Sequence, residues 1–314
     1  KRIVQLTDWL PPEFSAVSQY ALRICSEEAA AGHDVVIVGL STGVVDPPKA
    51  PSGGSLRVIA VPRHRYNKAS WALRLLWSLR TNYRLIRSAW PWLRQADVIR
   101  FTGAPPFMLH FIAPANLILR KRLVYRITDF YPECIIAALG RRNALLELAR
   151  KYTNVLRRRV HLIEALGRDM EQKLVDAGVS PARIALRRDD TPVTIDATTA
   201  PLPRPAELQG KIALLYSGNF GVAHDVDTFF EGYRRHHRDG RGKVVLWLNA
   251  TGAGAEALAE QLTRDGLPFY RQKLVPLEDL ARLLVTPDAH LITLRPEFSG
   301  LVLPSKVYGC LATG

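Results

Sequence analysis

The sequence predicts an α/β protein made of two domains, each a parallel sheet covered by helices. The chain has 314 residues, of which 47% are hydrophobic and 23% charged, a composition typical of globular proteins long enough for two domains. Short apolar runs alternate with segments of helical periodicity along the whole chain, which is typical of parallel sheets with crossover helices. A proline-rich stretch, residues 198–210, interrupts this alternation, so we place the domains at residues 1–200 and 201–314.

The first domain begins with a βαβ pattern that ends in the near-continuous apolar run DVVIVG, residues 34–39. Strands are expected at residues 2–6, 34–39, 56–61, 97–101, 123–127, 161–165 and 184–186, and helices at 15–31, 107–119, 144–159 and 169–177. No G-x-G-x-x-G motif follows the first strand, which argues against a dinucleotide-binding domain here.

The second domain repeats the pattern after the proline-rich stretch. Strands are expected at residues 211–216, 244–248, 268–270 and 289–294. One helix is expected to begin at about residue 226, a second to end at residue 262, and a third to cover residues 277–284. Pro304 and Ser305 then give a helix-start signal directly before Lys306.

Three loops of this second domain carry glycine or proline and should lie at one edge of its sheet. They are residues 217–221, 249–254 and 295–305, each following an expected strand. Glycine permits close backbone approach, and the N-terminus of a following helix favours anions, so the loops together indicate a nucleotide-diphosphate site, with Lys306 adding a charge. The alternative is ordinary strand-to-helix turns with a solvent-exposed lysine.

Two carboxylates, Asp129 and Glu133, follow the strand at residues 123–127 and should lie at the carboxyl edge of the first sheet. A carboxylate in this position can orient or deprotonate a sugar hydroxyl. Alternatively, Asp129 caps the helix that follows it.

The positive charge is concentrated in the first domain. Residues 1–200 hold 30 Lys and Arg against 17 Asp and Glu, whereas residues 201–314 hold 13 against 12. Residues 63–94 contain eight of these cations, no acid and four of the six tryptophans. Basic helices with Trp and Leu on the other face bind at membrane interfaces, which predicts contact with an anionic membrane surface. The alternatives are a covering helix with a solvated basic face, or, on charge alone, nucleic-acid binding, for which we see no motif.

The cysteines and the lengths of the apolar runs indicate the cellular compartment. The three cysteines form no C-x-x-C pattern, which indicates a reducing compartment without disulfides or a zinc cluster. No apolar run reaches the roughly 18 residues of a membrane span, and no signal peptide opens the chain. We therefore expect a cytoplasmic protein.

The order of motifs resembles glycosyltransferase family 4. The pattern is YSGNFG followed by HD, then LNATGAG, then LRPEFSGLVLPSK and a final YG-x-LA-x-G, and the segments DWLPPEFSA, ADVIRFTGAPP and VYRITDFYPE resemble the first domain of that family. Within it, the chain looks most like bacterial enzymes that build O-antigen, capsule and colanic-acid-type polysaccharides. The resemblance implies the GT-B fold, two Rossmann-like domains facing across a cleft, and a retaining transferase that needs neither metal nor cofactor beyond its nucleotide-sugar donor.

The resemblance also suggests roles for individual residues. The expected donor-binding residues are Gly218, Asn219, Phe220, Gly221, His224, Thr251, Gly252, Phe298, Ser299, Gly300, Pro304, Ser305 and Lys306. The expected catalytic residues are Asp129, with Glu133 as second choice, and Glu297. Glu13, Phe14 and Ser15 are expected on the acceptor side. The composition of residues 63–94, rather than the resemblance, places Arg74, Trp77, Arg80, Arg84 and Arg87 at the membrane.

The chain departs from the family pattern in two respects. Many members carry two glutamates eight positions apart before the last helix, and the corresponding positions here are Leu301 and Gly309. The pattern also continues past Gly314, so we expect a domain shortened at its C-terminal end. The predicted partners are a nucleotide-sugar donor, a lipid-linked saccharide acceptor and the inner face of the cytoplasmic membrane, and not nucleic acid. The alternative is a non-catalytic nucleotide-sugar-binding or membrane-surface scaffold.

Overall fold

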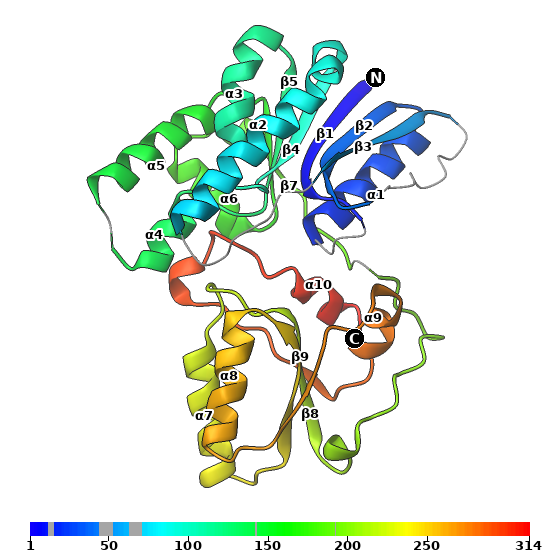
Figure 1. Cartoon of the computed structure of the whole chain (residues 1–314), viewed down its shortest axis with the longest axis vertical. Helices are drawn as coiled ribbons and strands as arrows, with labels where there is room; N and C mark the ends of the chain where they lie inside the picture. The colour runs from blue at the N-terminus through cyan, green and yellow to red at the C-terminus, as the bar shows by residue number, and fades with distance from the viewer. Residues whose placement is uncertain (12–15, 44–52, 63–70, 142, 192) are drawn as a thin grey trace. The chain divides into compact units, whose positions relative to one another are not determined.

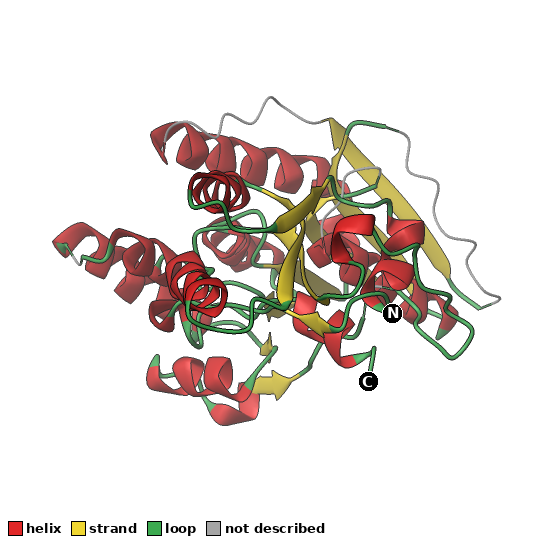
Figure 2. Ribbon diagram, turned by 90° about the horizontal axis from the view of Figure 1, so that it is seen from below, coloured by secondary structure: helices red, strands yellow, loops and turns green. Residues whose placement is uncertain are grey.

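The chain folds into two compact α/β units (Figure 1). The computed structural model describes residues 1–11, 16–43, 53–62, 71–141, 143–191 and 193–314. Unit 1 contains Lys1–Arg188 together with Gly300–Leu303, and unit 2 contains Asp189–Ser299 and Pro304–Gly314. In each unit, helices flank the strands of a sheet (Figure 2).

Unit 1 is built on a seven-stranded sheet of order β3-β2-β1-β4-β5-β6-β7, and every neighbouring pair is parallel. Its strands are β1 (Arg2–Trp9), β2 (Asp34–Ser41), β3 (Ser55–Pro62), β4 (Val98–Thr102), β5 (Arg122–Ile127), β6 (Leu162–Ala165) and β7 (Ile184–Leu186). All seven expected strands are present. The inner strands are apolar runs that are largely buried on both faces, whereas the edge strands β3 and β7 are partly exposed.

Helices cover both faces of this sheet. They are α1 (Ala16–Ala30), α2 (Trp71–Gln95), α3 (Met108–Leu119), α4 (Glu133–Leu139), α5 (Ala144–Arg157) and α6 (Arg168–Asp176), with a short 3-10 turn at Pro181–Arg183. The crossover through α1 runs from β1 to β2, whereas the crossover through α2 runs back from β3 to β4, in the opposite direction along the sheet. Since crossovers are right-handed, α1 and α2 lie on opposite faces. On the α2 face, α3 packs between α2 and α5 (Figure 1).

Unit 2 has a four-stranded parallel sheet of order β10-β9-β8-β11. Its elements are a 3-10 turn (Ala206–Leu208), β8 (Ile212–Asn219), α7 (Val226–Arg238), β9 (Val244–Thr251), α8 (Ala253–Arg264), β10 (Phe269–Gln272), α9 (Leu277–Leu284), β11 (Ala289–His290), a second 3-10 turn (Pro296–Phe298) and α10 (Lys306–Leu311).

Three strand boundaries of unit 2 differ from the prediction. β8 and β9 extend through Asn219 and Thr251, so residues expected in loops are paired in the sheet. β11 has only two residues, and the expected strand over residues 289–294 is wrong beyond His290. β11 is an edge strand, and the carbonyl of Thr293 binds His224 instead of continuing the ladder.

A buried ion pair in unit 1 joins α5 to the loop that follows β5. Arg157, 1% exposed, donates through Nη1 and Nη2 to the two carboxylate oxygens of Glu133, at 2.5 and 3.0 Å. Nη2 also donates to the carbonyl oxygen of Tyr131 at 3.0 Å, and the guanidinium lies 4.8 Å from the centre of the Phe130 ring. The pair therefore fixes the conformation of residues 130–133.

Replacing Arg157 with leucine should destabilise unit 1 strongly, because the Glu133 carboxylate would lose its counter-ion in a mostly buried position. Breaking one partner of a buried pair costs about 3–5 kcal/mol. The matched control is Arg150→Ala, which removes a surface pair with Glu147 and should cost at most about 1 kcal/mol. Urea unfolding monitored by circular dichroism measures both changes, and equal losses in the two variants would contradict a structural role for Arg157.

Candidate functional site

Two glycine-bearing loops meet at the carboxyl edge of the unit 2 sheet. The amide of Phe220, after β8, donates to the carbonyl oxygen of Thr251 at the end of β9. Gly252 has φ +102°, and a Cβ there would lie 2.5 Å from the Asn219 side-chain oxygen. A residue with a side chain is therefore excluded at position 252, which explains how these loops pack so closely.

Lys306 lies beside these loops in a cage of neutral groups. Its ammonium donates to the Tyr216 hydroxyl at 2.7 Å, lies 3.4 Å from Nε2 of His224 and sits 4.1 Å from the centre of the Tyr216 ring. Gly218, at φ +119°, lies against the lysine stem, since a Cβ there would be 3.8 Å from its Cε. No carboxylate of the described residues forms an ion pair with Lys306. Burial lowers the pKa of Lys306 to about 8.

His224 completes the cage as a neutral imidazole. Its Nδ1 lies 2.7 Å from the carbonyl oxygen of Thr293, which can only accept, so Nδ1 carries the proton. Nε2 is then an acceptor that faces the Lys306 ammonium. Burial, followed by the nearby Lys306 charge, lowers the pKa of His224 to about 4. Near neutral pH, the cage therefore holds one positive charge and no negative one.

The other predicted donor residues lie in several environments. Phe220 and Phe298 are buried, and the Phe220 amide is already paired, so it is not free to bind an anion. Gly221 is half-buried, and Thr251 and Ser305 are exposed. Gly300 belongs to unit 1 and packs against Lys173. Ser299 and Pro304, which precede and follow the segment 300–303, belong to unit 2. The helix α10 has only six residues, so the positive charge of this site resides mainly in Lys306.

In unit 1, Asp129 follows β5 at the carboxyl edge of the sheet. The Thr128 hydroxyl donates to its carboxylate at 3.2 Å, and burial raises the pKa of Asp129. Residue 129 also forms an isolated antiparallel bridge with Val302. The capping alternative is wrong, because the N-cap of α4 is Pro132 and no side chain caps this helix.

The second carboxylate, Glu133, is bound on both oxygens by Arg157, as described above. Glu297 is exposed and lies 3.6 Å from Arg295. Glu13, Phe14 and Ser15 lie outside the described residues. Among the described residues, no cluster of His, Cys, Asp and Glu could hold a metal ion.

Sequence reasoning missed two residues of these sites. Tyr216 was interpreted only as part of a buried strand, although its hydroxyl binds Lys306. Arg157 was expected only as part of the helix over residues 144–159, although it is buried against Glu133. A tyrosine directly before a Ser-Gly-Asn turn was the one available signal, since a buried tyrosine hydroxyl requires a partner.

The predicted membrane residues lie on α2. Arg80 and Arg87 are exposed, and Arg74 and Arg84 are half-exposed. Trp77 stacks on Trp9 with ring centres 5.5 Å apart, so it packs within unit 1. The exposed apolar side chains of α2 are instead Leu73, Leu75, Leu76, Leu79 and Tyr83. In the part of the chain that the structure describes, no helix is both long and apolar enough to cross a bilayer.

Two parallel α/β units are the elements of a GT-B fold, and solved structures agree with this fold. Anabaena Alr3699/HepE, in complex with UDP and glucose, matches all of this chain and 79% of its own at a TM-score of 0.64 and 12% identity. WaaG, a glycosyltransferase involved in lipopolysaccharide biosynthesis, matches 99% of this chain and 79% of its own chain, at a TM-score of 0.60 and a sequence identity of 16%.

Residues 17–186 match the family model of Glycosyltransferase Family 4, which is more than half of the chain, and the chain belongs to this family. Escherichia coli (strain K12) WcaI, named as a colanic acid biosynthesis glycosyl transferase, is 23% identical over 337 aligned positions that cover 96% of this chain and 79% of WcaI. The predicted family and the predicted GT-B fold are therefore confirmed.

The low pKa of Lys306 predicts how anion affinity depends on pH. Because the pKa of about 8 lies below the ordinary value for lysine, the site loses its charge as pH rises through 8. The affinity for a nucleoside diphosphate should fall by up to about tenfold per pH unit above that point. The Lys306→Arg variant should bind without this dependence, since arginine stays charged.

Lys306→Ala should bind about ten- to a hundredfold more weakly even at pH 7, because a charge-assisted hydrogen bond contributes about 1.5–3 kcal/mol. Lys243→Ala, an exposed lysine at the amino edge of β9, is the control. Calorimetric titration with UDP and GDP at pH 6 to 10 measures these affinities. A pH-independent affinity in the wild type would show that Lys306 does not contact the diphosphate.

Proposed function

We propose that the protein transfers a sugar, with retention and without a metal ion, from a nucleotide-diphosphate sugar to a lipid-linked saccharide in the synthesis of a cell-surface polysaccharide. The observation that supports this most is the half-buried Lys306 ammonium, which has neutral neighbours and no carboxylate partner among the described residues. Such a cation favours an anionic ligand. The relative WcaI is named for colanic acid biosynthesis, which supports the assignment to polysaccharide synthesis.

In this proposal the donor diphosphate binds at the carboxyl edge of the unit 2 sheet. Lys306 neutralises the negative charge that develops on the leaving diphosphate, and this charge stabilisation is the main contribution of the site to catalysis. The backbone donors that we assign to phosphate oxygens are the N–H groups of Ser305 and Asn219, because Gly218 is already paired with Ala250 in the sheet. Gly252 and Thr251 line the neighbouring loop. Because Lys306 already supplies a positive charge, the site needs no divalent cation.

Asp129 is the residue that we assign to the acceptor hydroxyl. Among the described residues, the Thr128 hydroxyl donates to the Asp129 carboxylate, and the raised pKa of Asp129 favours proton uptake. Glu133 is less suited, because Arg157 occupies both of its oxygens. Glu297, which is exposed, is a third candidate for contact with the sugar.

Asp129→Asn should keep donor affinity and lose at least about a hundredfold of the transfer rate, which is the usual contribution of a positioned acid or base. The measurement is nucleotide release from a panel of UDP-, GDP-, CMP- and TDP-sugars, beside calorimetric affinity for the same donors. Glu297→Gln is the comparison variant. Transfer near the wild-type rate in Asp129→Asn would overturn the assignment, and donor binding without turnover in the wild type would favour the scaffold alternative.

We also propose that unit 1 binds the inner face of the cytoplasmic membrane through the outer surface of α2, α3 and α5. The apolar side chains exposed on these helices are Leu73, Leu75, Leu76, Leu79, Tyr83, Leu117, Ile118, Leu145, Leu148 and Tyr152. Cations lie among them, including Arg80 and Arg87 on α2 and Lys151 on α5. Leucine and tyrosine beside arginine are typical of segments that bind at the membrane interface. A lipid-linked acceptor would be presented at the same surface.

This surface predicts membrane binding that needs anionic lipid and weakens with salt, because the Debye length falls from about 10 Å at 0.1 M to about 3 Å at 1 M. Cosedimentation with vesicles that contain or lack anionic lipid measures it. The variant Arg80→Glu with Arg87→Glu should lose most of the binding, since each cation contributes about 1 kcal/mol. The matched control is Arg235→Glu with Arg238→Glu, on the exposed face of α7. Equal binding to neutral and anionic vesicles would exclude this electrostatic attachment.

A further inference from the structure

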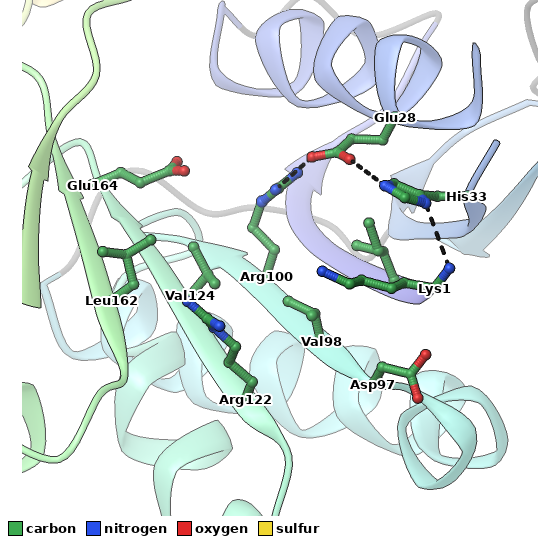
Figure 3. Close-up of a pocket in the computed structure, with 11 residues that line it drawn as sticks. Lys1, Glu28, His33, Asp97, Val98, Arg100, Arg122, Val124, Leu162 and Glu164 are labelled. Atoms are coloured by element: carbon green, nitrogen blue, oxygen red, sulfur yellow. Dashed lines mark hydrogen bonds and ion pairs between the residues drawn. The ribbon is translucent and has the colours of Figure 1, made fainter. Parts of the chain in front are cut away.

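A cavity of about 470 Å³ opens on the α1 face of the unit 1 sheet, and the proposed transfer reaction does not use it (Figure 3). Its apolar floor consists of Ile3, Val98, Val124 and Leu162, from four adjacent strands. Glu28 and His33 line one side, and Glu164 lies on the other (Figure 3). A cavity of this volume is large enough for a small-molecule ligand.

The strand register explains why charged groups surround this floor. Val98 pairs with Arg122, and Arg100 pairs with Val124, so all four side chains lie on one face of the sheet. Strands buried in a parallel sheet are ordinarily apolar, yet this face carries Arg100, Arg126 and Glu164, each less than 10% exposed. Packing alone does not account for such a set of side chains.

Arg100 is incompletely hydrogen-bonded. Its Nη2 donates to Glu28 at 2.8 Å, but Nε and Nη1 are buried and have no hydrogen-bond partner among the described residues. Arg100 is 7% exposed and lines the cavity. Buried guanidinium groups normally have their N–H donors satisfied, so the unpaired donors indicate an acceptor that the chain itself does not supply.

The acids around the cavity already have cationic partners. Glu28 accepts from Arg100, Glu164 accepts from Arg126 and Arg187, and Asp97 forms an ion pair with the Arg2 guanidinium at 3.9 Å. Arg122, at the cavity mouth, is exposed and has no ion pair or hydrogen bond of its side chain among the described residues. The cations near the cavity therefore exceed the acids, and the surplus favours an anion.

We propose that this cavity binds an amphiphilic anion, a small molecule with a phosphate or carboxylate group on an apolar body. The anionic group binds Arg122 and the unpaired donors of Arg100, and the apolar body covers Val98, Val124 and Leu162. Val98 and Arg122 begin their strands, so the cavity lies toward the amino edge of the sheet, whereas Asp129 follows the carboxyl end of β5. The site is therefore separate from the proposed acceptor residue.

The test is calorimetric titration of the whole chain with hexyl phosphate, beside hexanol and inorganic phosphate. Hexyl phosphate should bind more tightly than either fragment, and Arg122→Ala should weaken it at least about tenfold, the effect of losing one charge-assisted hydrogen bond. Val98→Phe, which fills the floor without changing the charge, should abolish binding, and its melting curve checks that the variant is folded. Arg238→Ala is the matched control for removal of an exposed arginine.

Two further variants separate this cavity from the other anion-binding surfaces. Lys306→Ala and the variant Arg80→Glu with Arg87→Glu should both bind hexyl phosphate like the wild type. The proposal is overturned if hexanol binds as tightly as hexyl phosphate, if Arg122→Ala binds normally, or if either of these two variants abolishes binding. None of these results depends on whether the protein transfers a sugar.

Discussion

The chemistry of unit 2 depends on one desolvated cation, the ammonium of Lys306. Neutral groups surround it, since the Tyr216 hydroxyl accepts from it and His224 presents an unprotonated Nε2. A carboxylate in either place would have compensated the charge and left nothing to attract a phosphate. Partial burial of the Lys306 ammonium without a counter-ion disfavours its charged form, which is why the pKa of Lys306 is lowered. An anionic ligand would supply the counter-ion and stabilise the charged form. The cage thus favours a bound state over an empty one.

The apolar runs predicted two α/β units and nearly every strand, because strands of a parallel sheet are recognisable as such runs, whereas the GT-B fold was expected from the order of the family motifs. The errors occur where tertiary pairing overrides local composition. Ser217 and Asn249 look like loop residues, yet they pair in register because the apolar strands before them continue into one ladder. Arg157 looks like a surface residue in a basic run, yet Glu133 and Phe130 bury it. Neither partner is near in sequence, so no local pattern could have predicted these contacts.

In the candidate site, too, the sequence could not predict contacts between distant residues. Proline and serine before Lys306 predicted the start of α10, and the structure begins that helix at Lys306. The partners of the lysine, Tyr216 and His224, are 90 and 82 positions away, so sequence alone could not show that they form one cage. The choice between Asp129 and Glu133 likewise depends on Arg157, which binds the Glu133 carboxylate, whereas Asp129 accepts from the Thr128 hydroxyl.

The missing glutamate pair has a structural counterpart in α10. Gly309 is buried, and a Cβ there would lie 3.0 Å from Leu284 Cδ1, so the glycine lets α10 pack closely on α9. Position 309 is also three residues beyond Lys306, on the same side of the helix, where a glutamate side chain comes within reach of a lysine ammonium. A glutamate at position 309 would therefore both separate the two helices and compensate the lysine charge. The close contact between α10 and α9 thus depends on the glycine at position 309, where a glutamate would also add a negative charge one helical turn from Lys306.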